Sequence, residues 1–128
     1  MKIEGSKILV TGGAGLIGST TIDQLLANEK PAEIVILDNM SRGSTRNLEN
    51  ALKDERVKLI QGDIRDKDLV YKVTEGMDAV IHMAAIRITA CAADPREAME
   101  VMNDGTFNVI DAAHKLSLIH ISEPTRPY

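Results

Sequence analysis

The chain has 128 residues, a formal net charge of −4 and 44% hydrophobic residues, which is typical of one soluble domain with its own core. The negative charge argues against a general nucleic-acid-binding surface, and no apolar run approaches the length that crosses a membrane. Cys91 is the only cysteine, so an intramolecular disulfide is excluded, and the first residues lack the apolar core of a signal peptide. We therefore expect a cytoplasmic protein with no membrane or nucleic-acid partner.

Apolar runs and helical patterns alternate along the chain. In chain order they predict a strand at 7–11, a helix at 16–28, a strand at 33–38, a short helix at 44–53, a strand at 57–63, a helix at 66–74, a strand at 78–83 and a long helix from 95 to about 115. Asp94 is the expected N-cap of the long helix, with Glu97 completing a capping box. Nearly all-apolar strands that alternate with helices predict an α/β fold whose parallel sheet is covered on both faces.

Three glycines stand between the first strand and the first helix, in the sequence TGGAGLIG. A G-x-G-x-x-G pattern is weak alone but has a mechanism in this position. Gly12 permits the tight turn, Gly15 lets the backbone approach a pyrophosphate, and Gly18 lets the helix pack closely. The phosphates would then meet free N–H groups at the positive end of the helix dipole. Asp38, at the end of the second strand, can accept both ribose hydroxyls of an adenosine and repels a 2′-phosphate, so we predict a dinucleotide site.

Four motifs, TGGAGLIG, DNMSRG, GDIRD and VIHMAA, occur in this order and spacing. In them the chain resembles the extended short-chain dehydrogenase/reductase family, in particular its NAD-dependent sugar-nucleotide epimerases and dehydratases of the UDP-glucose 4-epimerase type. The resemblance covers residues 7 to about 115. It implies a Rossmann-like, doubly wound parallel sheet, here truncated after about four strands, with NAD as the cofactor and NADP as the less favoured alternative.

The resemblance also implies which residues contact the cofactor besides the three glycines. The expected contacts fall into four groups: Leu16 and Ile17 at the pyrophosphate; Asp38, Asn39, Ser41, Arg42 and Gly43 around the adenosine ribose and phosphate; Asp63 and Ile64 at the adenine; and Met83, Ala84, Ala85 and Arg87 at the nicotinamide-side ribose and the phosphates. Within the third group, the Asp63 carboxylate is expected near the exocyclic amine of adenine.

Some of these residues have structural alternatives. Arg42 could pair with a phosphate of NADP or be a solvated loop residue. Asp63 could serve only a turn, because Asp favours turns, and Arg87 could be a surface charge. His82 ends an apolar strand, and we expect a core residue with satisfied hydrogen bonds there rather than a catalyst.

The segment EVMNDGT departs from the family pattern. Relatives usually carry N-V-x-G-T in the long helix, whereas Asn103 is displaced by one residue and so turned about 100° around a helix. We therefore assign it no cofactor contact. Gly105 does match, and we expect it to let the helix lie close to the sheet. The residues of this helix expected in the core are Met99, Val101, Met102, Gly105 and Val109.

The Tyr-x-x-x-Lys pair that moves the hydroxyl proton in relatives is not in this sequence. The two tyrosines are Tyr71 and Tyr128, and neither has a lysine four residues later. The segment LSLIHISEPTR, at 116–126, resembles codon by codon an adapter used in transposase-based DNA sequencing. We therefore interpret residues 1–115 as an incomplete NAD(P)-binding domain and 116–128 as a non-native tail. The competing interpretation is a natural fifth strand, LSLIHI.

The expected function is the NAD-binding portion of a sugar-nucleotide epimerase or dehydratase, in which bound NAD oxidises a sugar hydroxyl and later returns the hydride. We expect the intact enzyme to take a nucleotide-sugar substrate and to form a homodimer. The 128-residue chain, without a catalytic residue or a metal site, is expected to be inactive. The alternatives are an NAD(P)-dependent sugar-nucleotide reductase or oxidoreductase, and a non-catalytic dinucleotide sensor.

Overall fold

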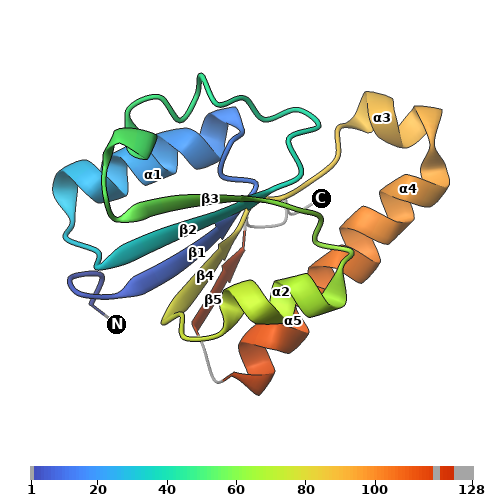
Figure 1. Cartoon of the computed structure of the whole chain (residues 1–128). Helices are drawn as coiled ribbons and strands as arrows, with labels where there is room; N and C mark the ends of the chain where they lie inside the picture. Colours follow the sequence, from blue (N-terminus) through green and yellow to red (C-terminus); the bar gives the residue numbers. More distant parts are fainter. Residues whose placement is uncertain (1, 117–118, 123–128) are drawn as a thin grey trace, which may run out of the picture.

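The computed structural model describes residues 2–116 and 119–122. Five strands form one parallel sheet in the order β3-β2-β1-β4-β5 (Figure 1). The strands are β1 (Lys7–Thr11), β2 (Glu33–Asp38), β3 (Val57–Gln61), β4 (Ala79–His82) and β5 (Ile119–Ser122). Every neighbouring pair is parallel, with Leu9 opposite Val35 on one side and Val80 on the other. The prediction of a Rossmann-like, doubly wound fold is confirmed.

Side chains alternate along each strand, so a strand buried on both faces contributes to two cores. Leu9, Leu37 and Val80 belong to the core on one face of the sheet. Ile8 and Ile36 point into the core on the other face. The continuous apolar runs in the sequence therefore have a direct cause, because no strand face in the middle of this sheet meets water.

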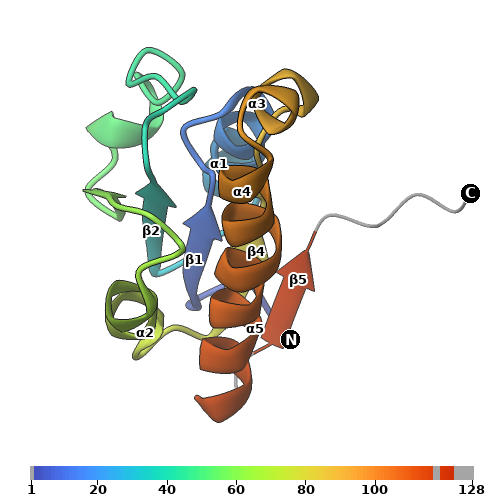
Figure 2. The same ribbon diagram turned by 90° about the vertical axis from the view of Figure 1, so that its right-hand side faces the viewer.

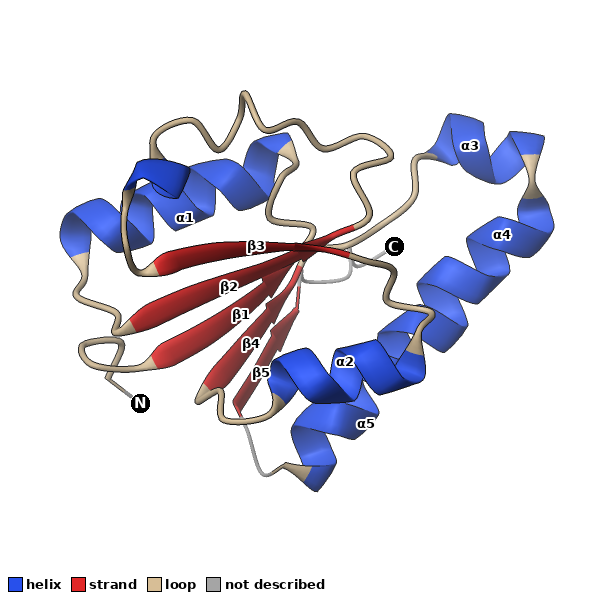
Figure 3. Ribbon diagram, in the orientation of Figure 1, coloured by secondary structure: helices blue, strands red, loops and turns tan. Residues whose placement is uncertain are grey.

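Helices cover both faces of the sheet (Figure 3). On one side lies α1 (Leu16–Asn28), with the short 3-10 helix η1 (Ala51–Lys53). On the other side, α2 (Lys67–Thr74) packs against α5 (Thr106–Lys115). Asp66 caps α2 by accepting a hydrogen bond from the Leu69 amide at 3.1 Å. Because all the strands are parallel, the loops that follow them lie at one end of the sheet.

The predicted long helix is present, but its middle is a π-helix. It runs as α4 (Pro95–Met99), η2 (Glu100–Gly105) and α5, and Figure 2 shows α4 and α5 as one rod in front of the sheet. Asp94 is the N-cap as predicted, and its carboxylate accepts a hydrogen bond from the Glu97 amide at 3.1 Å. The π turn makes i→i+5 hydrogen bonds, so each residue rotates less than 100° around the axis. The side chains of α5 therefore do not point in the directions that a regular helix continuing from α4 would give them.

Several sequence expectations about burial and element bounds are wrong. Met99 and Met102 are 43% and 44% exposed rather than in the core, and Met102 lies in the π-helical stretch, where the phase of a regular helix does not hold. Val101, Gly105 and Val109 are buried as expected. The expected helix at 44–53 is reduced to turns followed by η1, and a short helix, α3 (Ile88–Ala93), was not predicted.

The edge of the sheet next to β4 is occupied by β5. This strand lies in the segment expected to be a non-native tail, and its backbone pairs with β4 in a register that sets Ile81 opposite Ile121. The sheet thus has one strand more than the four expected from residues 1–115. The remainder of the tail, 117–118 and 123–128, lies outside the described residues. Within the described ranges, no helix is both long enough and apolar enough to cross a membrane.

Candidate functional site

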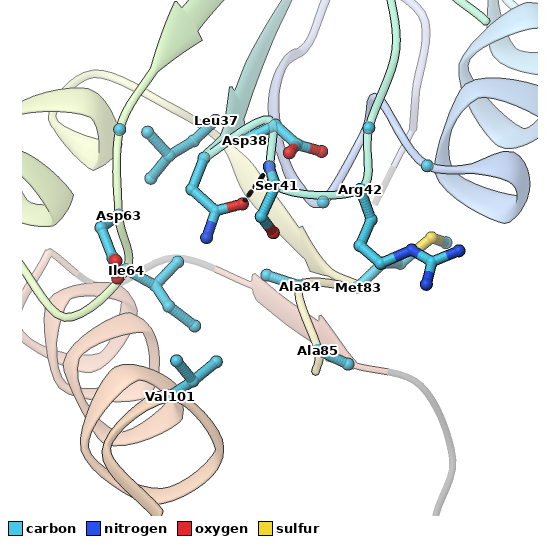
Figure 4. A pocket seen from close by; sticks show the side chains of 15 residues that line it. Leu37, Asp38, Ser41, Arg42, Asp63, Ile64, Met83, Ala84, Ala85 and Val101 are labelled. Atoms are coloured by element: carbon cyan, nitrogen blue, oxygen red, sulfur yellow. Dashed lines mark hydrogen bonds between the residues drawn. The ribbon is translucent and has the colours of Figure 1, made fainter. Parts of the chain in front are cut away.

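A pocket opens at the carboxyl ends of the first four strands (Figure 4). The chain leaves β1 toward β2 on one side and later returns to β4 on the other, so the strand order reverses between β1 and β4. Ligands of open α/β sheets bind at such a switch point. The residues that line the pocket are Gly12, Gly15, Leu37, Asp38, Asn39, Ser41, Arg42, Gly43, Gly62, Asp63, Ile64, Met83, Ala84, Ala85 and Val101.

Gly12 makes the turn between β1 and α1 possible. Its φ of 71° lies in the left-handed region, and a Cβ atom there would lie 2.7 Å from the backbone nitrogen of Ala84. Both the turn and the close approach of the β4 end therefore require a glycine. This agrees with the role expected for Gly12 in the sequence.

Gly18 and Gly15 have opposite environments. A Cβ at Gly18 would overlap the carbonyl oxygen of Gly12 and lie 2.7 Å from the Cα of Gly13, so the helix packs directly on the glycine loop. A Cβ at Gly15 would meet only the Gly12 oxygen, at 3.4 Å, and Gly15 lines the pocket. Gly15 is therefore not required by packing, and the open space beside it faces the pocket.

The helix α1 begins at Leu16, directly after Gly15. The first N–H groups of a helix have no acceptor within it, and they carry the positive end of the helix dipole. The Leu16 and Ile17 side chains are 77% and 65% exposed and do not line the pocket. At this position the backbone, rather than the side chains, has the chemistry to receive an anion.

Asp38 is the acid at the centre of the pocket. Only 8% of the residue is exposed, and its carboxylate accepts hydrogen bonds from the Ala14 amide (2.9 Å, to Oδ2) and the Met40 amide (2.8 Å, to Oδ1). A Cβ at Gly43 would lie 3.0 Å and 3.1 Å from the two oxygens. The carboxylate is thus fixed between the glycine loop and the loop after β2. Each oxygen keeps a lone pair for a further donor.

The loop after β2 forms one wall of the pocket. Asn39 accepts a hydrogen bond from the Ser41 amide at 3.0 Å, drawn as a dashed line in Figure 4. The Arg42 side chain is exposed at the rim and lines the pocket. A guanidinium at this rim can meet a phosphate without being buried itself.

Asp63 lies at the far end of the pocket, after β3. Its carboxylate is paired with Arg65, with Nη2 at 2.7 Å from Oδ2. Hydrogen bonding from the Arg65 side chain, opposed by partial burial, holds the pKa of the Asp63 carboxyl below its ordinary value. The Arg65 amide also donates to Oδ1 at 2.8 Å, so the turn role considered for Asp63 is real. The same carboxylate also lines the pocket, so the two roles are compatible.

His82 is buried and held by two threonines. Its Nδ1 lies 2.6 Å from the Thr11 hydroxyl and its Nε2 lies 3.2 Å from the Thr106 hydroxyl. The Thr11 oxygen also accepts hydrogen bonds from the Met83 and Ala84 amides. His82 therefore ties the ends of β1 and β4 to the long helix, as expected of a core residue with satisfied hydrogen bonds.

The structure gathers most of the expected cofactor contacts but not all. Arg87 is exposed just before α3 and lies outside the pocket lining, as do Leu16, Ile17 and Gly18. Sequence reasoning missed Leu37, Gly62 and Val101. Leu37 precedes Asp38 and Gly62 precedes Asp63, so each could have been predicted as the neighbour of an expected contact. Val101 reaches the pocket from η2, whereas the sequence predicted it only as a core residue.

Comparison with known proteins points to one group of enzymes. The chain is 34% identical over 119 residues to the dTDP-glucose 4,6-dehydratase of Mycolicibacterium smegmatis, covering 91% of this chain and 36% of that protein. It is 38% identical over 109 residues to the UDP-glucose 4-epimerase of the same organism, covering 84% of this chain and 34% of that one. This chain therefore spans about a third of the length of these relatives.

A solved structure has the same fold. The dTDP-glucose 4,6-dehydratase DesIV of Streptomyces venezuelae, with NAD and TYD bound, superposes with a TM-score of 0.81 at 35% identity, over 88% of this chain and 37% of that one. The model of the 3-beta hydroxysteroid dehydrogenase/isomerase family matches residues 9–122. The expected resemblance to NAD-dependent epimerases and dehydratases is confirmed. The chain belongs to the 3-beta hydroxysteroid dehydrogenase/isomerase family.

Proposed function

We propose that this chain is the NAD-binding portion of a sugar-nucleotide epimerase or dehydratase. The observation that carries the proposal is the Asp38 carboxylate, which is fixed in the pocket by two backbone N–H groups and has acceptor capacity left. Two vicinal ribose hydroxyls are the ligand that such a carboxylate suits best. The similar DesIV was solved with NAD bound, which supports the same choice.

Other groups of the pocket support the proposal for the remaining parts of NAD. The open space at Gly15 and the first N–H groups of α1 suit the pyrophosphate. Ile64 and Val101 offer apolar surface for the adenine, with Asp63 at its edge. Met83, Ala84 and Ala85 line the end of β4, where the nicotinamide-side ribose would lie. Leu16, Ile17 and Gly18 would contribute through the backbone and through packing, and Arg87 through movement of its exposed side chain.

The same carboxylate favours NAD over NADP. A 2′-phosphate placed next to the Asp38 carboxylate would bring two negative charges together in a partly buried site. Among the described residues that line the pocket, Arg42 is the one cation that could offset this repulsion, from the exposed rim. We expect NAD to bind more tightly because salt screens an exposed rim charge much more than a buried one.

In the longer protein, bound NAD would accept a hydride from a nucleotide-sugar substrate and later return it. The sequence has no Tyr-x-x-x-Lys pair to move the accompanying proton. Tyr71 lies on α2, its hydroxyl 3.5 Å from Asp111 on α5, at the packing of two helices rather than in the pocket. We therefore expect this chain to bind NAD and to turn over no sugar nucleotide.

The proposal includes a cytoplasmic protein that is a homodimer at full length. Four exposed apolar side chains on the long helix support self-association: Met99, Met102, Phe107 and Ile110. The exposed fraction of Phe107 is 65%, which is unfavourable for a monomer in water. The single cysteine is compatible with a reducing compartment.

Calorimetric titration of the chain with NAD and with NADP tests the proposal. We expect saturable binding of NAD with one site per chain, and weaker binding of NADP. Equal affinities would contradict the role of Asp38, and no binding of either dinucleotide would contradict the proposal itself. Addition of UDP-glucose and of dTDP-glucose to the NAD-loaded chain should give no product, and turnover would show that the chemistry needs no Tyr-x-x-x-Lys pair.

A further inference from the structure

Arg65 makes an unusual set of contacts beside the pocket. Its Nε lies 3.1 Å from both Asp63 oxygens, and its Nη2 lies 2.7 Å from Oδ2. Its Nη1 donates to Glu100 at 3.1 Å, and Nη2 lies 3.9 Å from Glu97. One guanidinium thus joins the turn after β3 to α4 and η2.

A second Asp-x-Arg turn at the other end of β3 shows which of these contacts are local. Before the strand, Arg56 donates to Asp54 from its amide (2.9 Å), its Nε (2.9 Å) and its Nη2 (2.7 Å). This pairing lowers the pKa of Asp54 to about 2. Among the residues that the structure describes, Arg56 reaches only the Pro31 carbonyl besides, at 3.4 Å, and Asp54 does not line the pocket. The turn alone therefore explains the Asp–Arg pair, but not the bond from Arg65 to the long helix.

The contacts leave the Asp63 carboxylate one free acceptor position. A carboxylate has about four lone-pair sites. Arg65 brings only three hydrogens to them, from its amide, its Nε and its Nη2, and the Nε–H is shared between the two oxygens. One further donor can be accepted. A carboxylate held in one orientation with a single open site distinguishes a donor from an acceptor at the ligand.

We propose that Arg65 is a positioning residue, which orients Asp63 to select the 6-amino group of the adenine and is itself held by Glu97 and Glu100. This inference rests on the proposed NAD site and deepens it. Without Arg65, Asp63 keeps the amide of residue 65 as a donor but loses the guanidinium that it shares with Glu97 and Glu100. The carboxylate is then no longer held in one orientation, and its preference for the amino group falls.

The test compares NAD with nicotinamide hypoxanthine dinucleotide, which carries a carbonyl in place of the 6-amino group. Both are titrated into the unchanged chain, Arg65→Ala, Arg65→Lys and the matched control Arg56→Ala, and the ratio of the two dissociation constants is recorded. We expect the unchanged chain to prefer NAD and Arg65→Ala to lose about tenfold of that preference, the size of one charged hydrogen bond. Arg65→Lys should keep part of it, and Arg56→Ala all of it.

The ratio of the two dissociation constants distinguishes a loss of positioning from a loss of folded protein. Both dinucleotides are measured on the same preparation, so a fraction of unfolded chain affects both equally. An unchanged or increased ratio in Arg65→Ala overturns the role of Arg65 and leaves the NAD site intact. A ratio near one in the unchanged chain overturns the selection by Asp63, and with it the role of Arg65. Failure of the unchanged chain to bind either dinucleotide overturns the proposed function as well.

Discussion

At the scale of single residues, the pocket depends on a few atoms that are fixed before any ligand binds. Asp38 is held by the amides of Ala14 and Met40, so its carboxylate loses little freedom when it accepts a ribose. Met40 also takes a positive φ of 63°, which is uncommon outside glycine. The sequence predicted Asp38 because the acid follows an apolar strand. The backbone donors that orient the carboxylate had no sequence signal.

Replacing Asp38 tests whether this carboxylate sets the choice of cofactor. Asp38→Ala should weaken NAD binding by about 1–3 kcal/mol, the cost of losing a charged hydrogen-bond partner. NADP binding should weaken far less or improve, because the repulsion of a 2′-phosphate is removed. Asp78→Ala is the matched control, since Asp78 also accepts a backbone amide, from Lys7 at 2.8 Å, at the opposite end of the strands. Equal losses for the two cofactors in calorimetry would contradict the assignment.

The glycines of the loop offer a second test, because their environments differ. Gly15→Val should leave the fold intact, since a Cβ there meets only one atom, at 3.4 Å, but should abolish NAD binding by filling the pyrophosphate space. Gly18→Val should instead lower the free energy of unfolding by about 2 kcal/mol or more, because its Cβ collides with backbone atoms. The chain would then unfold at a lower urea concentration. Circular dichroism with urea, beside an NAD titration, distinguishes the two effects. Retained NAD affinity in Gly15→Val would mean that the loop is only a turn.

At the scale of elements, the strands and helices that are marked by apolar runs and helix caps could be predicted from the sequence. β1, β2 and α1 have the predicted bounds, since each is a clear run or a 3.6-residue pattern between glycine or polar breaks. Met102 was misplaced because its burial was inferred from a regular helix, and a π turn changes the phase. No local signal marks that turn. Its last residue, Gly105, packs closely against the Ile64 side chain.

The contact between the long helix and the turn after β3 can be tested by a double mutant. Gly105→Ala places a Cβ 2.6 Å from two side-chain atoms of Ile64 and should destabilise the fold by about 1–3 kcal/mol. In an Ile64→Ala background those atoms are gone, so the same change should cost less. Urea unfolding of both single variants and the double variant measures the coupling. Strictly additive free energies of unfolding would show that the helix does not rest on Ile64.

At the scale of the whole molecule, the strand order determines where the pocket lies and which edge of the sheet is vulnerable. The order reverses between β1 and β4, and the pocket opens there. β4 is apolar, with Ala79 and Val80 fully buried, and β5 pairs with its outer edge. An uncovered apolar edge pairs readily with other chains. The topology was predictable from alternating strands and helices, and a strand through LSLIHI was one of the two interpretations of the tail.

Shortening the chain tests what β5 contributes. A chain that ends at Leu116 should form oligomers, because the edge of β4 is then open, whereas a chain that ends at Ser122 keeps β5 and should elute at a smaller size. Size-exclusion chromatography with light scattering compares the two. If both chains have the same mass, pairing with β5 does not protect the sheet.

The central claim, a single NAD site at the carboxyl ends of the first four strands, is tested most directly by an NMR titration of the isotopically labelled chain. On addition of NAD, backbone amide signals should shift in the four segments that meet at the pocket: 12–18, 38–43, 62–64 and 83–85. The amides at the opposite strand ends, such as Lys7 and Ala79, should stay in place. Shifts concentrated on the exposed face of the long helix, or no shifts at millimolar NAD, would contradict the account.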